Sequence, residues 1–243
     1  MIQKIIFYIL DIKYKYLLYG SIVRVQKGAY LQISNRVKII NSNIVVVRNS
    51  KLSIGDSSSF KNVNMVVEGE AEFGESNIIE NGYVNSKIDI GINGKIKVGS
   101  YNRLRCKIMV RFGGSLTIGS YTNINEESEV RTDELVCIGS FNQISYKCMI
   151  WDTNTHSIYQ YEKRRSLAID NYPMFGFEYE KPKTSPVNIG DDCWIGREAA
   201  ILKGTNIGNR CIIGFRTVLT SILIPDNFTV INEIKTKQIP NSI

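Results

Sequence analysis

A six-residue rhythm between Ile189 and Leu219 limits how this chain can fold more than any other feature of its 243 residues. The first position of each hexad is a branched aliphatic residue and the fifth is small. The first positions are Ile189, Ile195, Ile201, Ile207, Ile213 and Leu219, and the fifth are Cys193, Ala199, Thr205, Cys211 and Thr217. A helix would need apolar residues three and four apart, and an isolated strand would need them two apart. A period of six instead predicts short strands and turns that repeat as a solenoid.

Residues eighteen apart in this stretch are alike, as expected if three hexads close one triangular coil. The coil would stack Ile189 on Ile207, Ile195 on Ile213, Ile201 on Leu219 and Cys193 on Cys211. Stacking like on like lets a solenoid bury a continuous core from short faces. Glycine fills the second position of most hexads, where we expect a turn conformation that other residues resist. The pattern therefore predicts an all-β fold.

A second period, of twenty residues, lies upstream. It repeats an aliphatic-Gly-Ser-aromatic motif at Val98-Gly99-Ser100-Tyr101, Ile118-Gly119-Ser120-Tyr121 and Ile138-Gly139-Ser140-Phe141. We interpret these as coils of eighteen residues with about two extra at one corner. Ile54-Gly55 and Phe73-Gly74 are expected to belong to earlier, more degenerate coils.

These patterns divide the chain into five segments. We predict a short amphipathic helix over residues 1–20, degenerate coils over 21–158, an extended loop or arm over 159–186, regular coils over 187–224 and a C-terminal tail over 225–243. The apolar run from Ile5 to Leu10 is too short to span a bilayer. The helix would cap the open end of the β domain or lie on an anionic membrane surface, and both roles stay open.

The arm is polar, aromatic and proline-bearing, and it interrupts the solenoid just after His156. It carries Lys163, Arg164 and Arg165 among several tyrosines and phenylalanines. Long excursions from compact scaffolds are usually functional or disordered. Two readings remain, a floppy insertion or a lid or acceptor-binding arm, and the aromatic content favours the second.

Bulk composition narrows the function classes. The net charge of +7 is compatible with anionic ligands, and no nucleic-acid-binding motif accompanies it. Five cysteines without CxxC spacing favour a reduced, cytoplasmic setting. Cys193 and Cys211 fall in the small-residue position of the hexads, which disfavours a cysteine nucleophile.

His156 is the only histidine, in the run Asp152-Thr153-Asn154-Thr155-His156. A single imidazole rules out a metal site built from three histidines, and we expect no metal. It also leaves His156 as the natural general base near neutral pH. Asp152 and Asn154 are expected either to orient the ring or the acceptor, or to cap a turn, as both residue types often do.

Four motifs make the chain resemble the hexapeptide-repeat acyltransferases, and within them the branch that O-acetylates sugars and capsular polysaccharides. They are 152–158, 186–196 with Cys193-Trp194-Ile195-Gly196, 201–204, and 207–214, with Pro225-Asp226-Asn227 closing the match. The resemblance implies a left-handed parallel β-helix and a cytoplasmic homotrimer with each active site between neighbouring β-helices. It also implies acetyl-CoA as co-substrate and a carbohydrate as acceptor.

The resemblance also implies roles for individual residues. His156 stands where the family has its general base, and Trp194 matches an aromatic residue near the CoA arm, with a trimer-interface anchor as the alternative. Family CoA contacts fall at or beside Gly196, Arg197, Lys203, Phe215, Thr220 and Ser221, and Lys235 or Lys237 would meet the phosphates.

Two departures from the family pattern concern the cofactor groove. Gly214-Phe215-Arg216-Thr217 replaces the usual Gly-Ala-Gly-Ser, so the bulky Phe215 would narrow or reshape the groove. The closing motif reads Val230-Ile231-Asn232-Glu233-Ile234-Lys235, in which only the Asn and the Lys match. The departures affect the expected adenine and phosphate contacts and leave the thioester chemistry in place.

The sequence thus predicts an acetyl-CoA-dependent O-acetyltransferase that modifies a bacterial surface carbohydrate or its precursor. An N-acyltransferase acting on an amino-sugar nucleotide is the nearest alternative, because the same histidine would serve it. A non-catalytic β-solenoid scaffold is the alternative from another class.

Overall fold

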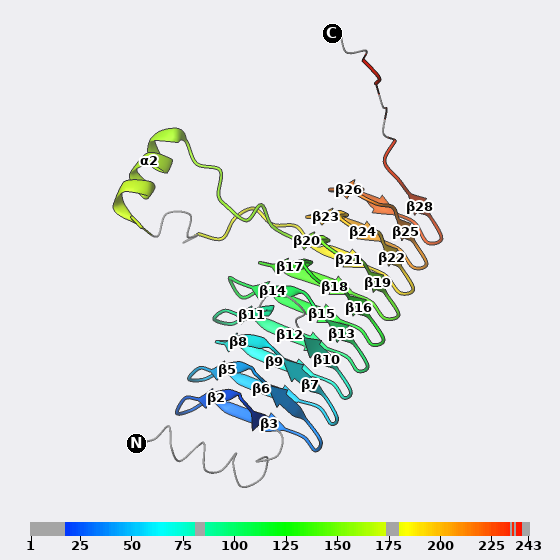
Figure 1. Cartoon of the computed structure of the whole chain (residues 1–243). Coiled ribbons are helices and arrows are strands. Elements are labelled where there is room, and N and C mark those ends of the chain that lie inside the picture. Colours follow the sequence, from blue (N-terminus) through cyan, green and yellow to red (C-terminus); the bar gives the residue numbers. More distant parts are fainter. Residues whose placement is uncertain (1–17, 81–85, 174–179, 234, 236, 240–243) are drawn as a thin grey trace.

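The computed structural model describes residues 18–80, 86–173, 180–233, 235 and 237–239. Over these residues the chain winds into a parallel β-solenoid whose coils each add one strand to each of three sheets (Figure 1). The sheets contain ten, nine and nine strands, and within each sheet the neighbouring strands of the described part pair in parallel. This is the all-β architecture that a left-handed β-helix has, so the predicted fold class is confirmed.

The first sheet contains β1 (Leu18–Tyr19), β4 (Lys38–Ile40), β7 (Ser59–Lys61), β10 (Ile78–Glu80), β13 (Arg103–Leu104), β16 (Asn123–Ile124), β19 (Gln143–Ile144), β22 (Trp194–Ile195), β25 (Ile212–Ile213) and β28 (Thr229–Val230). The second contains β2 (Ile22–Val25), β5 (Asn43–Val46), β8 (Val63–Val67), β11 (Ser86–Ile90), β14 (Lys107–Val110), β17 (Glu129–Thr132), β20 (Met149–Trp151), β23 (Ala200–Leu202) and β26 (Val218–Leu219). The third contains β3 (Tyr30–Ile33), β6 (Lys51–Ile54), β9 (Glu70–Phe73), β12 (Lys95–Val98), β15 (Ser115–Ile118), β18 (Leu135–Ile138), β21 (Val187–Ile189), β24 (Asn206–Ile207) and β27 (Leu223–Ile224).

The stacking predicted from the hexads is found in the strand registers. The pairs are Ile189 with Ile207, Ile195 with Ile213 and Ile201 with Leu219. Upstream, Val98, Ile118 and Ile138 are in register, as the period of twenty predicts. Ile54 and Phe73 are paired in an earlier coil. Each sequence repeat therefore corresponds to one physical coil.

The extra residues of the longer coils lie where the chain passes from the second sheet to the third. From Asn123 in β16 to Glu129 in β17 is six residues, whereas from Glu129 to Cys137 in β18 is eight. In the regular part, Ala200 in β23 and Asn206 in β24 are six apart. The same corner accommodates the arm between β20 and β21. This corner is thus where the solenoid tolerates insertions.

The glycines at the second position of the hexads are required for a different physical reason from the one expected. Gly190 does not take a positive φ, and a Cβ added to it would lie 2.7 Å from the backbone of Gly208 in the next coil. The left-handed conformation falls two residues later, at Asp192 (φ 58°). The expectation of a turn conformation at the glycine was therefore wrong, because close approach of successive coils is what requires it.

The repeated aromatic residue takes the left-handed position of its turn. Tyr101, Tyr121 and Phe141 have φ values of 60°, 58° and 60°. Their rings stack in parallel with centroids 5.0 and 5.1 Å apart. The period of twenty is therefore visible on the surface as an aromatic ladder.

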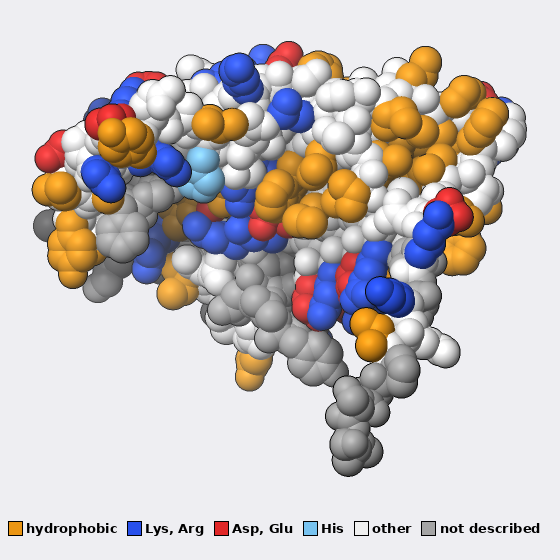
Figure 2. Space-filling model, turned by 90° about the horizontal axis from the view of Figure 1, so that it is seen from above, with side chains coloured by type: hydrophobic (Ala, Val, Ile, Leu, Met, Phe, Trp, Pro, Cys, Tyr) orange, Lys and Arg blue, Asp and Glu red, His pale blue; other side chains and the backbone are white. Residues whose placement is uncertain are grey.

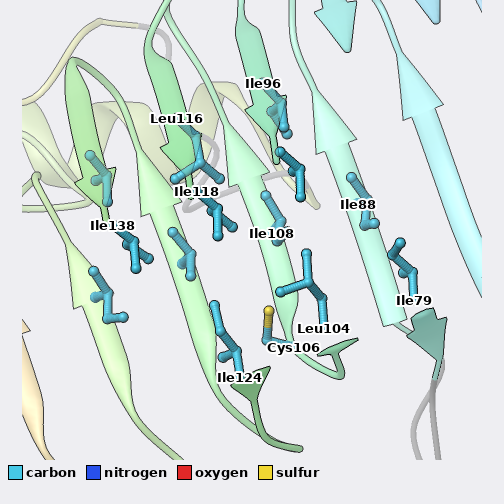
Figure 3. Packing of buried hydrophobic residues seen from close by; sticks show 14 of the residues in the cluster. Ile79, Ile88, Ile96, Leu104, Cys106, Ile108, Leu116, Ile118, Ile124 and Ile138 are labelled. Atoms are coloured by element: carbon cyan, nitrogen blue, oxygen red, sulfur yellow. The ribbon is translucent and has the colours of Figure 1, made fainter. Parts of the chain in front are cut away.

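The interior is a column of aliphatic side chains from all three sheets (Figure 3). Burial alternates along the strands, as in β12, where Ile96 and Val98 are buried and Lys95 and Lys97 are exposed. Each side chain lies on its register partner in the next coil, as Ile96 does on Leu116. This continuous packing makes the solenoid a firm base for residues at its corners.

The predicted N-terminal helix, arm and C-terminal tail can be compared with the structure only where the chain is described. Residues 1–17 of the expected N-terminal helix lie outside the described residues, and Leu18–Tyr19 form a strand. The arm contains a helix, α2 (Tyr161–Asp170), and strand pairing continues beyond residue 225 to Val230. Among the described residues there is no helix with the length and apolar character needed to cross a membrane.

All five cysteines lie in the described part of the chain and none forms a disulfide, so burial governs the reactivity of their thiols. Burial raises the pKa of Cys106 to about 12 and that of Cys193 to about 11. Because the thiolate is the reactive form, we expect iodoacetamide to label the half-buried Cys137 first and the other four only after unfolding. Mass spectrometry of the alkylated peptides tests this, with Cys137→Ser as control. Labelling of a second thiol in the folded protein would contradict it.

Candidate functional site

The candidate site lies along the edge between the second and third sheets. We call this edge the arm corner; its segments are 111–114, 133–134, 152–186, 203–205 and 220–222. The arm projects from it, away from the coils, with α2 at its far end (Figure 1). No side chain of α2 is buried. The arm is therefore a protrusion beside His156.

The two ends of the arm are joined at its base. Thr153 and Thr184 form an isolated antiparallel bridge. The backbone N–H of Asn154 donates to the carbonyl oxygen of Lys183 at 3.0 Å. The hydroxyl of Thr184 also donates to the carboxylate of Glu134, one coil earlier. These contacts close the base of the arm, which we call the arm neck, and the segment that carries His156 begins there.

Asp152 holds the corner by accepting backbone hydrogen bonds. Its Oδ1 accepts from the N–H of Asp133 at 2.8 Å, and its Oδ2 accepts from those of Glu134 and Leu135, both at 2.7 Å. The side chain is fully buried. Burial raises the pKa of Asp152, while these three bonds act in the opposite direction. The turn-holding role, one of the two expected for Asp152, engages both carboxylate oxygens.

We expect Asp152→Asn to lower the free energy of unfolding by about 1–3 kcal/mol, since an amide NH₂ leaves at least one buried N–H donor without an acceptor. Urea unfolding followed by circular dichroism measures the change. The exposed Asp170→Asn is the control, expected to change the free energy of unfolding by less than about 0.5 kcal/mol. Equal stability of Asp152→Asn and wild type would rule out the turn-holding role.

An ion pair lies beside this carboxylate. Arg111, at the end of β14, donates from Nε and Nη2 to the two oxygens of Asp133 at 2.9 and 2.6 Å. Asp133 is fully buried, and the backbone N–H of Asp133 is one of those bound by Asp152. Removing one partner of such a pair would leave an uncompensated buried charge, which is strongly destabilising. Arg111, Asp133 and Asp152 thus link three successive coils.

His156 follows at the surface. It is exposed, and Figure 2 shows it on the molecular surface with Lys and Arg side chains around it. The preceding Thr155 has φ 66°, and its N–H donates to Oγ1 of Thr153 at 3.0 Å. Asn154 is half-buried. An exposed imidazole on a braced backbone can exchange a proton with a bound molecule.

The residues expected to contact CoA fall into two groups. Lys203, Thr220 and Ser221 lie at the arm corner, on the two coils that follow His156. The N–H of Ser221 donates to the carbonyl oxygen of Lys203 at 3.1 Å, which keeps these coils in contact. This group shares an edge with His156. It is the part of the predicted cofactor set that the fold brings near the candidate base.

The second group lies on another side of the solenoid. Trp194 is 58% exposed on the outer face of the first sheet, and Gly196, Arg197 and Phe215 follow at the corner between the first and second sheets. In a three-sided coil, the first sheet is opposite the corner between the other two. Trp194 and His156 of one chain therefore face different ways. Lys235 lies beyond the last strand and is exposed.

The arm is basic and aromatic in the structure, as its sequence suggested. Lys163 lies 3.9 Å from the ring centroid of Tyr159 and donates to Glu180 at 3.2 Å. Arg165 lies 5.1 Å from the ring centroid of Tyr161. Residues 174–179, which include part of the aromatic run, are outside the described residues. The described part offers cations stacked on rings that remain accessible to solvent.

Sequence reasoning missed Arg111 and Asp133, because their spacing follows neither sequence repeat. Each directly follows a strand of the second sheet, as Asp152 does, so the ends of β14, β17 and β20 place all three at one corner. No cluster of three or more His, Cys, Asp or Glu that would suit a metal ion occurs within the described ranges.

Comparisons with known proteins agree with the repeat. A family model described as bacterial transferase hexapeptide (six repeats) matches residues 186–221. A protein of Staphylococcus aureus that carries the name acetyltransferase is 36% identical over 69 residues, which cover 28% of this chain and 33% of that protein. A chloramphenicol acetyltransferase of Morganella morganii is 41% identical over 78 residues, covering 28% of this chain and 36% of that protein. The chain thus matches about a third of the length of these relatives.

A solved structure matches over most of the fold. The polySia-specific acetyltransferase NeuO superposes with a TM-score of 0.54 at 16% identity, covering 88% of this chain and 83% of that one. At this identity the likeness is one of fold. The repeat, the β-solenoid and the relatives make the chain similar to hexapeptide-repeat transferases, and residues 186–221 are the part that matches the family model.

Proposed function

We propose that this chain is an O-acetyltransferase that moves acetyl from acetyl-CoA to a hydroxyl of a bacterial surface carbohydrate or its precursor. The observation that carries the proposal is the position of its only histidine, exposed at the start of the arm that leads into the matched hexapeptide repeat. The names of its relatives support acetyl transfer as the reaction.

His156 acts as the general base in this proposal. It accepts the proton of the acceptor hydroxyl as that oxygen forms a bond to the thioester carbonyl carbon. The imidazolium then returns the proton to the sulfur as the carbon–sulfur bond breaks, so the products are an acetyl ester and free CoA thiol. A positioned base contributes typically about 10²–10⁴-fold to such a step.

The arm supports a carbohydrate acceptor, and one with negative charge. Tyr159 and Tyr161 supply aromatic surface, and Lys163, Arg164 and Arg165 supply positive charge on the arm that begins beside His156. Aromatic rings suit the apolar faces of sugars, and cations suit their carboxylates. The fold neighbour NeuO is named for specificity toward polySia.

The placement of the two CoA groups supports a homotrimer with sites between chains. Lys203 and Ser221 share the corner of His156, whereas Trp194 faces the opposite side of the same chain. A head-to-tail ring of three chains would bring the arm corner of one copy to the first sheet of the next. We place the enzyme in the cytoplasm, with residues 1–20 as its contact to the membrane face.

Two measurements test the proposed function. Thiol release from acetyl-CoA is followed with acidic glycans, amino sugars and chloramphenicol as acceptors, and mass spectrometry locates the transferred acetyl group. We expect release that depends on a hydroxyl-bearing glycan, with an ester product labile to mild base. Transfer only to amino groups would favour the N-acyltransferase. Absence of transfer to every acceptor, with surface glycans unchanged when the gene is deleted, would favour the scaffold.

A further inference from the structure

We infer that Arg111 is a positioning residue for the candidate base, because it holds the backbone from which His156 extends. The inference rests on the proposed function, in which His156 takes the acceptor proton. Arg111 belongs to a coil outside the matched hexapeptide repeat, 44 residues before Thr155 in the sequence. Its role therefore comes from the three-dimensional arrangement of the corner.

The guanidinium of Arg111 connects the corner to the histidine segment. While Nε and Nη2 bind the carboxylate of Asp133 at 2.9 and 2.6 Å, Nη2 also donates to the carbonyl oxygen of Thr155 at 3.3 Å. The planar fork is fixed by its two-point contact with Asp133, so the third contact has a defined direction. The side chain of Arg111 is only 23% exposed.

Thr155 is a residue that needs such support. It is β-branched, and at φ 66° it lies in the left-handed region that such side chains avoid. Strained residues persist only where the surroundings hold them, and they cluster at functional sites. Here Thr153 accepts the N–H of Thr155, and Arg111 binds its carbonyl oxygen. Both peptide groups that flank Thr155 are therefore fixed, and the second one leads directly into His156.

The residue that orients Arg111 is itself held in place by a further hydrogen bond. Asp133, which orients Arg111, has its own N–H bound by the buried carboxylate of Asp152. The chain of contacts from Asp152 through Asp133 and Arg111 returns to Thr155, three residues after it began. This closed loop fixes the histidine segment more tightly than the arm neck alone would.

The test uses the fact that His156 is the only histidine, so a protein without a histidine tag gives one imidazole signal in NMR. We expect Arg111→Met to shift or broaden this signal and to lower kcat for acetyl transfer about 10- to 100-fold, with KM for acetyl-CoA unchanged. The double variant Arg111→Met/Asp133→Asn removes the unpaired buried charge and is expected to keep the same defects with near-wild-type stability. Arg111→Lys should rescue part of kcat.

The matched control is Arg105→Met, which breaks a partly buried ion pair with Glu126 at another corner. It is expected to leave the imidazole signal and kcat unchanged. Wild-type imidazole signals and kcat in Arg111→Met and in Arg111→Met/Asp133→Asn would overturn the inference, as would an equal effect of Arg105→Met. The NMR readout needs no acetyl transfer, so failure of the proposed function would appear separately, as absent transfer by the wild type.

Discussion

Replacing His156 by Ala is expected to lower kcat/KM for acetyl transfer by about 10²–10⁴-fold while leaving the fold intact. The large effect follows because His156 is the only imidazole in the chain, so no second imidazole can replace it as the base. The small effect on stability follows because the side chain is exposed. Thiol release and urea unfolding, measured on the same preparations, separate the two quantities.

Chemical rescue sharpens this test. Since the site of the missing ring is open to solvent, added imidazole is expected to restore part of the rate of His156→Ala and to leave the wild-type rate unchanged. His156→Gln serves as control, because its larger side chain leaves no space for imidazole. Thiol release by His156→Ala at the wild-type rate would remove the histidine from the mechanism and favour the scaffold.

The solenoid was predictable because its geometry is periodic in the sequence. Each coil must place an aliphatic residue on the one before it, so Ile189 and Ile207 repeat at the coil length and reveal the register. The glycine positions were equally visible, but their physical reason was not. The contact that excludes a side chain at Gly190 comes from Gly208, in another coil, and no local rule describes it.

His156 could be named as a candidate base from the sequence, whereas the contacts that hold its backbone could not be predicted. His156 stands out as the only histidine, but the ion pair beneath it joins residues 22 apart, and the next link joins residues 19 apart. These separations differ because the coils differ in length at the arm corner. Charged partners at unequal spacing leave no period, so only the folded chain shows that Arg111 and Asp133 meet.

The residues predicted to contact CoA lie on two sides of the solenoid. This placement predicts how much activity a mixture of two inactive variants recovers. If each site combines the His156 side of one chain with the Trp194 side of its neighbour, His156→Ala and Trp194→Ala damage different halves of every site. Each variant alone should be nearly inactive. Trimers assembled from an equal mixture should recover about one quarter of wild-type activity, because one interface in four receives both intact halves.

Co-expression of the two variants, each with a different non-histidine tag, gives the mixed trimers, and analytical ultracentrifugation establishes their size. The control is either single variant mixed with His156→Ala/Trp194→Ala, which provides no interface with both halves intact and should recover nothing. Neither variant chain carries both His156 and Trp194. Activity can therefore return only at an interface between two different variant chains. Mixed trimers that stay inactive would rule out a site that combines His156 of one chain with Trp194 of its neighbour. An active Trp194→Ala variant would place Trp194 outside the site. A monomer in solution would require a site built from one chain, which the opposite placement of Trp194 and His156 does not provide.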